Sequence, residues 1–163
     1  MPRFDTIRTV PFSADEMFAL VADVEKYPLF VPLCESLVVH SREQRSDGTG
    51  LITATMGIGY KAIHETFTTS VTLDRAARLI LVQHKNGPFR KLENVWNFTP
   101  RTEPAAGQAC NVRFSLEYEF SSPILAVLMG AVFDTAFRKF AQAFEDRAGE
   151  IYGRRAPVTS VLT

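Results

Sequence analysis

The last part of the chain has the pattern of a single long amphipathic helix, which restricts the possible folds strongly. Ser122 occupies a helix-cap position and Pro123 the first helical position. Gly153 is a typical residue at a helix end, so the helix is predicted from Pro123 to about Tyr152. At about 100° per residue, its apolar residues fall in one stripe. The stripe contains Leu125, Met129, Val132, Phe133, Ala136, Phe137, Phe140, Phe144 and Ile151. So wide a stripe must be buried against another layer.

Between Glu35 and Phe120 the sequence has the alternation of antiparallel strands. The clearest strand places five apolar residues at every second position: Val112, Phe114, Leu116, Tyr118 and Phe120. An earlier strand shows the same alternation at Ile52, Ala54, Met56 and Ile58. Asp47-Gly48 and Asn86-Gly87 are typical turn residues between strands. These signals predict about six consecutive antiparallel strands.

A further strand is predicted before them, from Arg3 to Val10. Ser13 and Glu16 then form a capping box, which predicts a helix start. Pro28 and Pro32 interrupt the segment that follows and leave a short helical turn and a loop. Another loop is predicted from Pro100 to Gly107.

The predicted order is a strand, two short helices, a run of antiparallel strands and one long helix. A single helix with such a stripe must lie across one face of the sheet. We therefore predict an α+β helix-grip fold in one domain, residues 1–153, with a disordered polar tail over 154–163. A twisted sheet around one helix leaves a gap lined by both apolar faces. The fold therefore predicts an internal cavity.

Composition narrows the function classes. Eighteen basic and eighteen acidic residues give zero net charge, so no overall field attracts nucleic acid, and DNA is not an expected partner. Cys34 and Cys110 are too few for a disulfide scaffold. The start lacks the apolar run of a signal peptide, and no segment has the ~20 apolar residues of a membrane span. We expect a cytoplasmic protein, with peripheral contact at the inner face of the cytoplasmic membrane as an option.

No catalytic or metal-binding constellation stands out. The three histidines, His40, His64 and His84, are scattered singly, so neither a metal site nor a cofactor is expected. Cys34 has no base near it in sequence and is expected to be a buried, inert thiol. Gly57-x-Gly59 lacks the third glycine and the following helix of a phosphate-binding loop. We therefore expect a protein that is not an enzyme and has no catalytic residues.

Polar residues occur on strand faces that are otherwise apolar. Asn94 lies between Leu92 and Trp96 on one face of a strand. A further strand is predicted from Lys61 to Leu73, in which Lys61 and Glu65 share the parity of the apolar residues Ile63 and Phe67. Such a group either bonds to the protein itself, at a bulge or to backbone, or meets a carbonyl or hydroxyl of a ligand in the cavity. Lys61 is near a strand end, where its amine can reach water.

The phenylalanines of the last helix also allow two interpretations. Phe133, Phe137 and Phe140 either pack as core or form flat walls for a ring or a prenyl chain. For Phe144 and Ile151, nearer the end of the helix, we expect core packing.

The first half of this helix is apolar nearly all round. Ile124, Val127, Leu128 and Ala131 lie off the buried stripe. Their cover is the loop from Pro28 to Cys34, a second copy of the chain, or a membrane. In the membrane alternative, Ile124, Val127 and Leu128 form a membrane-docking surface.

A series of short motifs runs along the chain from Val10 to Gly153. They are Tyr27-Pro28-x-Phe30-x-Pro32-x-Cys34, Phe67-Thr68-Thr69, Gly87-Pro88-Phe89-Arg90-Lys91-Leu92, Trp96-x-Phe98, Tyr118-x-Phe120, Val132-Phe133 and Ala143-Phe144-x-x-Arg147-Ala148-x-Glu150-Ile151-Tyr152. As an ordered set they resemble the bacterial and mitochondrial coenzyme Q-binding proteins, of the START-like group of polyketide cyclases and lipid-transport proteins. This resemblance implies a START-like helix-grip fold with a hydrophobic tunnel.

The resemblance also implies a ligand, ubiquinone or a related polyprenyl lipid, and a role in its delivery to the respiratory chain. By position, the loop from Phe30 to Cys34 would border the tunnel, and Trp96 and the last helix would line it. The predicted ligand-binding residues are Phe30, Val31, Pro32, Phe67, Asn94, Trp96, Met129, Phe133, Phe137 and Phe140.

Two alternatives remain open. The same family includes a bacterial ribosome-association toxin that binds the large ribosomal subunit, and these motifs do not separate the two functions. Lys85, Arg90 and Lys91 would give a small basic surface. A chain with zero net charge, however, lacks the favourable free energy of counterion release that dominates RNA binding. A cyclase-like enzyme is the third alternative, and it lacks an acid–base pair. Quinone or polyprenyl-lipid binding is therefore the leading hypothesis.

Overall fold

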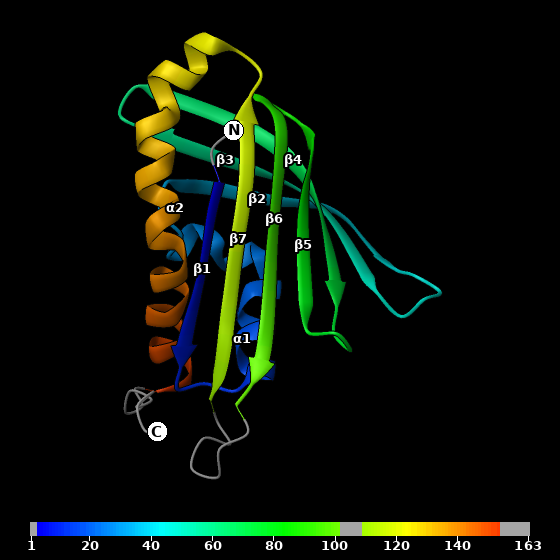
Figure 1. Ribbon diagram of the computed structural model, residues 1–163. Helices are drawn as coiled ribbons and strands as arrows, with labels where there is room; N and C mark the ends of the chain where they lie inside the picture. Colours follow the sequence, from blue (N-terminus) through cyan, green and yellow to red (C-terminus); the bar gives the residue numbers. More distant parts are fainter. Residues whose placement is uncertain (1–2, 102–108, 154–163) are drawn as a thin grey trace.

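In the computed structural model, which describes residues 3–101 and 109–153, one long helix lies across the concave face of an antiparallel sheet (Figure 1). The elements in chain order are β1 (Arg3–Val10), α1 (Ala14–Ala22), the 3-10 helix η1 (Val24–Leu29), β2 (Cys34–Gln44), β3 (Gly50–Tyr60), β4 (Ile63–Asp74), β5 (Leu79–Asn86), β6 (Phe89–Pro100), β7 (Cys110–Phe120) and α2 (Pro123–Tyr152). The predicted helix-grip order is confirmed. Most of the predicted 100–107 loop and the predicted tail lie outside the described residues.

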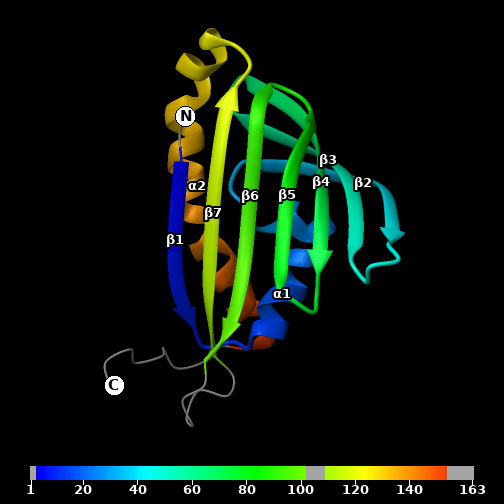
Figure 2. The ribbon, with the colours of Figure 1, turned by 45° about the vertical axis from the view of Figure 1, so that its right-hand side comes forward.

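Within the described residues the sheet has seven strands in the order β1-β7-β6-β5-β4-β3-β2. All neighbouring strands pair antiparallel, and the first strand of the chain closes the sheet beside the last. Register shifts interrupt the pairing at four places, two of them in β2. Such bulges bend and twist strands. The sheet curves around α2, as Figure 2 shows from a second direction.

The strand alternation predicted from the sequence is confirmed in β7 and β3. In β7 the side chains of Val112, Phe114, Leu116, Tyr118 and Phe120 are all buried. In β3, Ile52, Ala54 and Ile58 are buried, and Met56 packs against the same core. The strand predicted from Lys61 instead begins at Ile63, because Lys61 lies in the β3–β4 turn with a φ of 55°.

The capping box of α1 is formed as predicted. The Ser13 hydroxyl accepts a hydrogen bond from the Glu16 backbone N–H at 3.0 Å, and the Ser13 N–H donates to the Glu16 carboxylate at 2.9 Å. This reciprocal pair satisfies two backbone donors at the helix end. The apolar face of α1, which includes Met17 and Phe18, is buried.

Helix α2 begins and ends where its cap residues predicted. The Ser122 hydroxyl accepts from the backbone N–H groups of Ile124 and Leu125, and Gly153 ends the helix with a φ of 88°. Its buried residues are Met129, Phe133, Ala136, Phe137, Ala141, Phe144 and Ala148. The predicted apolar stripe is therefore confirmed for most of its residues between Met129 and Phe144.

The expected core position of Ile151 is wrong, since its side chain is 49% exposed. The buried face of α2 rotates along the helix as the sheet curves. In the last turn this face passes through Ala148 to Tyr152, whose hydroxyl donates to the Glu16 carbonyl in α1 at 3.0 Å. Ile151 is turned away from this contact and faces solvent.

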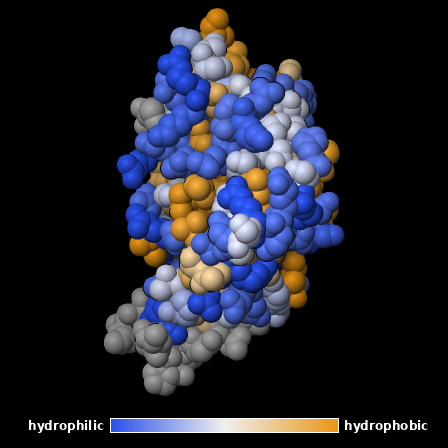
Figure 3. Space-filling model, turned by 90° about the vertical axis from the view of Figure 1, so that its right-hand side faces the viewer, coloured by the Kyte–Doolittle hydropathy of each residue, from blue (hydrophilic) through white to orange (hydrophobic). Residues whose placement is uncertain are grey.

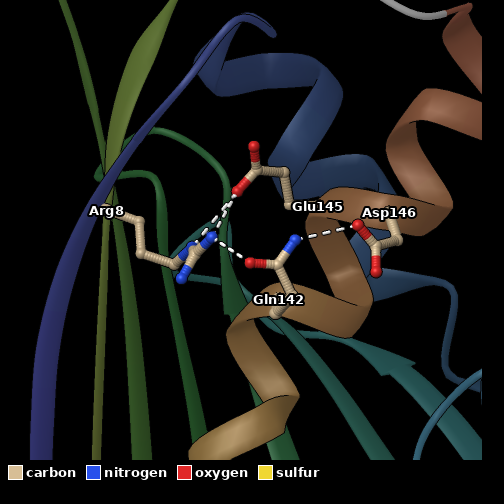
Figure 4. A network of polar contacts seen from close by, with 4 residues as sticks. All are labelled: Arg8, Gln142, Glu145 and Asp146. Carbon is tan, nitrogen blue, oxygen red and sulfur yellow. Dashed lines mark hydrogen bonds and ion pairs between the residues drawn. The ribbon is translucent and has the colours of Figure 1, made fainter. Parts of the chain in front are cut away.

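A polar network holds the C-terminal half of α2 to the edge strand β1 (Figure 4). The Arg8 guanidinium donates to the Glu145 carboxylate at 2.8 Å and to the Gln142 side-chain oxygen. Gln142 in turn donates to Asp146 at 2.8 Å. Arg8 and Glu145 are partly shielded from water, so the contact fixes the helix more firmly than a fully exposed ion pair would.

Gly87, in the β5–β6 turn, offers a test of the fold. Its φ is 140°, and a Cβ atom there would lie 2.5 Å from Cβ of Phe67. Gly87→Ala should lower the free energy of unfolding by about 1–3 kcal/mol. Gly130→Ala, in α2 with nothing within 4 Å of its Cβ position, should raise it by about 0.5–1 kcal/mol. Urea denaturation followed by circular dichroism measures both, and equal stability of the two variants would contradict this turn geometry.

Candidate functional site

A cavity of about 80 Å³ lies between the concave face of the sheet and α2. Its lining comes from η1 and the loop after it, from the inward faces of β3 to β7 and from the middle of α2. The lining residues are Tyr27, Pro32, Leu33, Met56, Ile58, Phe67, Val82, Leu92, Asn94, Trp96, Phe114, Leu116, Phe133, Ala136, Phe137, Phe140 and Phe144. The wall is almost wholly apolar, which matches the lining of a site for an apolar ligand.

Most of the residues predicted to bind a ligand lie at this cavity. Pro32, Phe67, Asn94, Trp96, Phe133, Phe137 and Phe140 line it.

The other three predicted residues, Phe30, Val31 and Met129, are absent from the wall. The Phe30 ring packs edge-on against Phe144 at 5.0 Å, with the Arg147 guanidinium above it at 5.4 Å. Val31 and Met129 are buried in the core. Phe30 therefore packs behind Phe144, which lines the cavity, and does not line the cavity itself.

Several lining residues escaped the sequence prediction. Met56, Ile58, Leu92, Phe114 and Leu116 lie on strand faces whose alternation was recognised as inward, so that alternation could have found them. The contribution of the loop had no comparable signal. Leu33 reaches the cavity from a left-handed backbone conformation with a φ of 67°, which no periodic pattern indicates.

Stacked aromatic rings form the α2 side of the cavity. The Phe133 and Phe137 rings lie 5.4 Å apart and nearly parallel, and Phe133 also stacks on Phe120 of β7 at 5.3 Å. Phe140 meets Phe137 edge-on at 5.1 Å. Rings held in such arrangements gain stability beyond their burial alone. They present flat apolar surfaces to the cavity and also belong to the core, so both interpretations of these residues apply.

Asn94, the polar residue expected on this face, has protein partners. Its side-chain N–H donates to the Ser115 carbonyl of β7 at 2.8 Å, and its oxygen accepts from the Trp96 indole N–H at 2.9 Å. The amide retains one N–H and one lone pair for a ligand. These contacts agree with the first of the two alternatives, that Asn94 bonds to the protein itself. They also orient the indole of Trp96 at the cavity wall.

The titratable groups at the cavity and near its edge are poorly suited to acid–base chemistry. Within the described residues, Tyr27 is the titratable group in the lining; burial raises its pKa, and its hydroxyl donates to the Val21 carbonyl at 2.5 Å. Burial also raises the pKa of the Cys34 thiol to about 11 and that of Cys110 to about 12. Both thiols are therefore protonated at neutral pH and weakly nucleophilic.

A groove of about 360 Å³ lies outside the cavity, between α2 and the β3–β4 turn. Its lining residues are Pro32, Leu33, Tyr60, Ala131, Val132, Thr135, Ala136 and Lys139. Pro32, Leu33 and Ala136 line both spaces, so they form the partition between the cavity and the groove.

Comparisons with known proteins give the family context. The family described as "Polyketide cyclase / dehydrase and lipid transport" matches residues 10–145. The ribosome association toxin RatA of Escherichia coli is 35% identical over 95% of this chain and 92% of its own length. The mitochondrial coenzyme Q-binding protein COQ10 homolog B of Xenopus laevis is 29% identical over 91% of this chain, which spans 58% of that longer protein.

Among solved structures, a START superfamily protein from Mycobacterium smegmatis has the same fold. Its TM-score is 0.72 at 19% identity, over 91% of this chain and 98% of that one. The START-like helix-grip class predicted from the sequence is thereby confirmed.

The hydrogen bonds of Asn94 generate a stability prediction. Asn94→Leu keeps the volume but leaves the Trp96 indole N–H and the Ser115 carbonyl without this partner. The free energy of unfolding should fall by about 1–3 kcal/mol. Asn97→Leu, on the outward face of the same strand, should change it by less than ~0.5 kcal/mol. Urea denaturation monitored by the fluorescence of Trp96, the sole tryptophan, measures both; an unchanged stability of Asn94→Leu would contradict the assigned bonds.

Proposed function

The chain belongs to the polyketide cyclase / dehydrase and lipid transport family, and from this premise we propose that it binds ubiquinone or a related polyprenyl lipid between the sheet and α2. The observation that carries the proposal is the cavity between the sheet and α2, whose wall is apolar apart from Asn94 and the hydroxyl of Tyr27, which is bonded to backbone. Apolar walls with a few placed polar groups are typical of sites for such ligands.

The chemistry of a quinone fits this wall. The stacked rings of Phe133 and Phe137 offer flat surfaces to a quinone ring or a prenyl chain. The free N–H of Asn94 can donate to a quinone carbonyl, while its other bonds keep the amide in place. The relative from Xenopus laevis carries coenzyme Q binding in its name, which supports this choice of ligand.

The cavity has to widen before it can hold this ligand. An engineered cavity of ~150 Å³ in another protein binds benzene, and the present volume of about 80 Å³ is near half of that. A substituted quinone ring is larger than benzene. The ligand-bound state therefore requires movement of the wall.

The partition at Pro32, Leu33 and Ala136 is the place where the wall can open. The C-terminal half of α2 is fastened by the Arg8–Glu145 ion pair and by the bond from Tyr152 to α1. The half of α2 that precedes Ala136 borders the outer groove instead. We assign ligand entry to a movement between this half of α2 and the loop that carries Pro32.

The proposal includes delivery of the bound quinone to the respiratory chain as a carrier, without chemical change of the ligand. The described lining supplies no acid–base pair for a cyclase reaction, because the hydroxyl of Tyr27 is bonded to backbone and its pKa is raised. We accordingly propose that the protein is not an enzyme and needs no cofactor.

Ribosome association is the second candidate, and sequence similarity favours it. The relative named ribosome association toxin is more similar, at 35% identity, than the coenzyme Q-binding relative at 29%. The charge distribution gives little support. Two of the three cations at the β5–β6 turn are paired, Arg90 with Glu119 at 3.2 Å and Lys91 with Glu117 at 2.6 Å. Lys85 remains without an ion pair in the described part of the chain.

A substitution at the partition tests quinone binding. Ala136→Leu fills the passage between cavity and groove and should weaken binding of a short-tail ubiquinone by about tenfold, or ~1.4 kcal/mol. Ala131→Leu, which borders only the groove, is the matched control and should bind like the parent. Quenching of Trp96 fluorescence measures the affinity, and circular dichroism checks that Ala136→Leu is folded. Equal affinities of a folded Ala136→Leu variant and the parent would overturn the proposed entry route.

Sedimentation separates the second candidate from the first. Purified protein mixed with large ribosomal subunits should stay at the top of a sucrose gradient if lipid binding is its function. Should it sediment with the subunits at physiological salt, the Lys85→Glu variant tests whether this turn is the contact. Because Lys85 is unpaired and exposed, its charge reversal should weaken a contact made there. Co-sedimentation that survives quinone saturation would favour ribosome association.

A further inference from the structure

The first turns of α2 carry exposed aliphatic side chains. Ile124 is 70% exposed, Val127 83% and Leu128 56%. These turns stand beyond the end of β7 at one end of the molecule (Figures 1 and 2). Figure 3 shows hydrophobic atoms at this end above a mainly hydrophilic surface. The loop from Pro28 to Cys34, one of the covers considered from the sequence, leaves the three side chains exposed. We call Ile124, Val127 and Leu128 the apolar tip.

Two lysines and a tyrosine lie along the groove outside the cavity, which α2 borders from Ala131, three residues after the apolar tip, to Lys139. Tyr60 is 39% exposed and lines the groove, and the Lys61 ammonium is 5.3 Å from the centre of its ring. Lys139 lines the same groove from α2. Neither lysine forms an ion pair with another residue of the described ranges 3–101 and 109–153. The neighbouring cation Arg138, in contrast, is paired with Asp134 at 3.0 Å.

We propose that this end of the molecule docks on an anionic phospholipid bilayer. In this docking the side of α2 that borders the groove is turned towards the bilayer, with the apolar tip at the level of the acyl chains and with Lys61 and Lys139 at the lipid phosphates. An apolar surface flanked by lysines and an interfacial tyrosine is the combination that binds at a membrane surface. None of the described helices is long and apolar enough to cross a membrane, so this contact is peripheral.

The small area and the charges favour a bilayer over other partners. Three side chains expose a few hundred square ångströms, whereas a stable protein–protein interface buries roughly 800 Å² on each partner. The positive charges of Lys61 and Lys139 complement the phosphates of anionic lipids. RNA would use the lysines but gain nothing from Ile124 and Val127, which have no aromatic surface for stacking on bases.

The docking surface lies next to the proposed route into the cavity. The groove that carries Lys139 is separated from the cavity by Pro32, Leu33 and Ala136. A molecule docked in this way holds the groove against the bilayer, so an apolar ligand could pass between membrane and cavity without crossing water. The docking itself is independent of the proposed quinone binding, because it uses only the outer surface.

Flotation of the full chain with lipid vesicles tests the proposal without any quinone. Vesicles of phosphatidylcholine alone are compared with vesicles that also contain phosphatidylglycerol. The parent should float with the anionic vesicles. Val127→Glu combined with Leu128→Glu should abolish flotation, since two carboxylates cannot enter the acyl region. Ile7→Glu is the matched control, because Ile7 is 64% exposed on β1, away from the tip, and should float like the parent.

A second variant separates the role of the lysines. Lys61→Gln combined with Lys139→Gln should weaken partitioning into anionic vesicles by about tenfold and leave that into neutral vesicles unchanged. Circular dichroism and binding of a short-tail quinone check that every variant is folded. A parent protein that binds quinone but does not float would therefore contradict the docking proposal and leave the quinone-binding proposal intact.

Three results would overturn the docking proposal. One is a parent that never floats, and another is a double-glutamate variant that floats like the parent. The third is a double-glutamate variant that still floats but has lost another association of the parent. Loss of a concentration-dependent dimer would assign the tip to a second copy of the chain, and loss of co-sedimentation with ribosomes would assign it to the ribosome.

Discussion

One long helix, with the short α1 and η1 beside it, has to cover the concave face of a seven-stranded sheet, and the rest of the structure follows from this mismatch in size. A helix with its side chains is ~10–12 Å wide, whereas strands spaced ~4.8 Å apart make such a sheet about 30 Å wide if flat. Curvature of the sheet and large aromatic side chains reduce the difference. The remaining space is the cavity between the sheet and α2, and the wide Phe residues of α2 form its wall on the helix side.

The two halves of α2 are held to the rest of the molecule in different ways. The C-terminal half is fastened: Phe144 packs edge-on against Trp96 at 4.9 Å and Tyr27 at 5.3 Å, and Arg8 holds Glu145 from the edge strand. The N-terminal half, which has no charged residue before Asp134, leaves its outer side exposed and borders the groove beside the β3–β4 turn. A wall that opens at one end and is fixed at the other can admit a ligand without loss of the fold. The exposed apolar tip belongs to this N-terminal half and lies next to the groove at which we propose that the ligand enters.

The parts of the fold that could be predicted are those with a periodic signal. Alternation identified β7 residue by residue, and the cap residues Ser122 and Gly153 gave the limits of α2. The helical stripe placed Phe133, Phe137 and Phe140 correctly at the cavity. A straight helical projection failed at Ile151, because the contact face rotates with the curvature of the sheet.

Other features depended on tertiary geometry that a sequence pattern does not contain. The position of Phe30 behind Phe144 and the left-handed backbone of Leu33 are set by a loop without periodicity. The partners of Asn94 come from the pairing of β6 with β7 and from the rotamer of Trp96. The three residues shared by cavity and groove emerge only when η1, its following loop and α2 are assembled.

The central claim is that the space between sheet and helix holds an apolar lipid. Native mass spectrometry of protein purified from its own host, followed by organic extraction and lipid analysis, tests this most directly. We expect a population whose added mass equals that of a polyprenyl quinone or a related lipid, and we expect to recover that lipid in the extract. Protein that is always free of lipid, and that is recovered with the ribosome fraction instead, would contradict it.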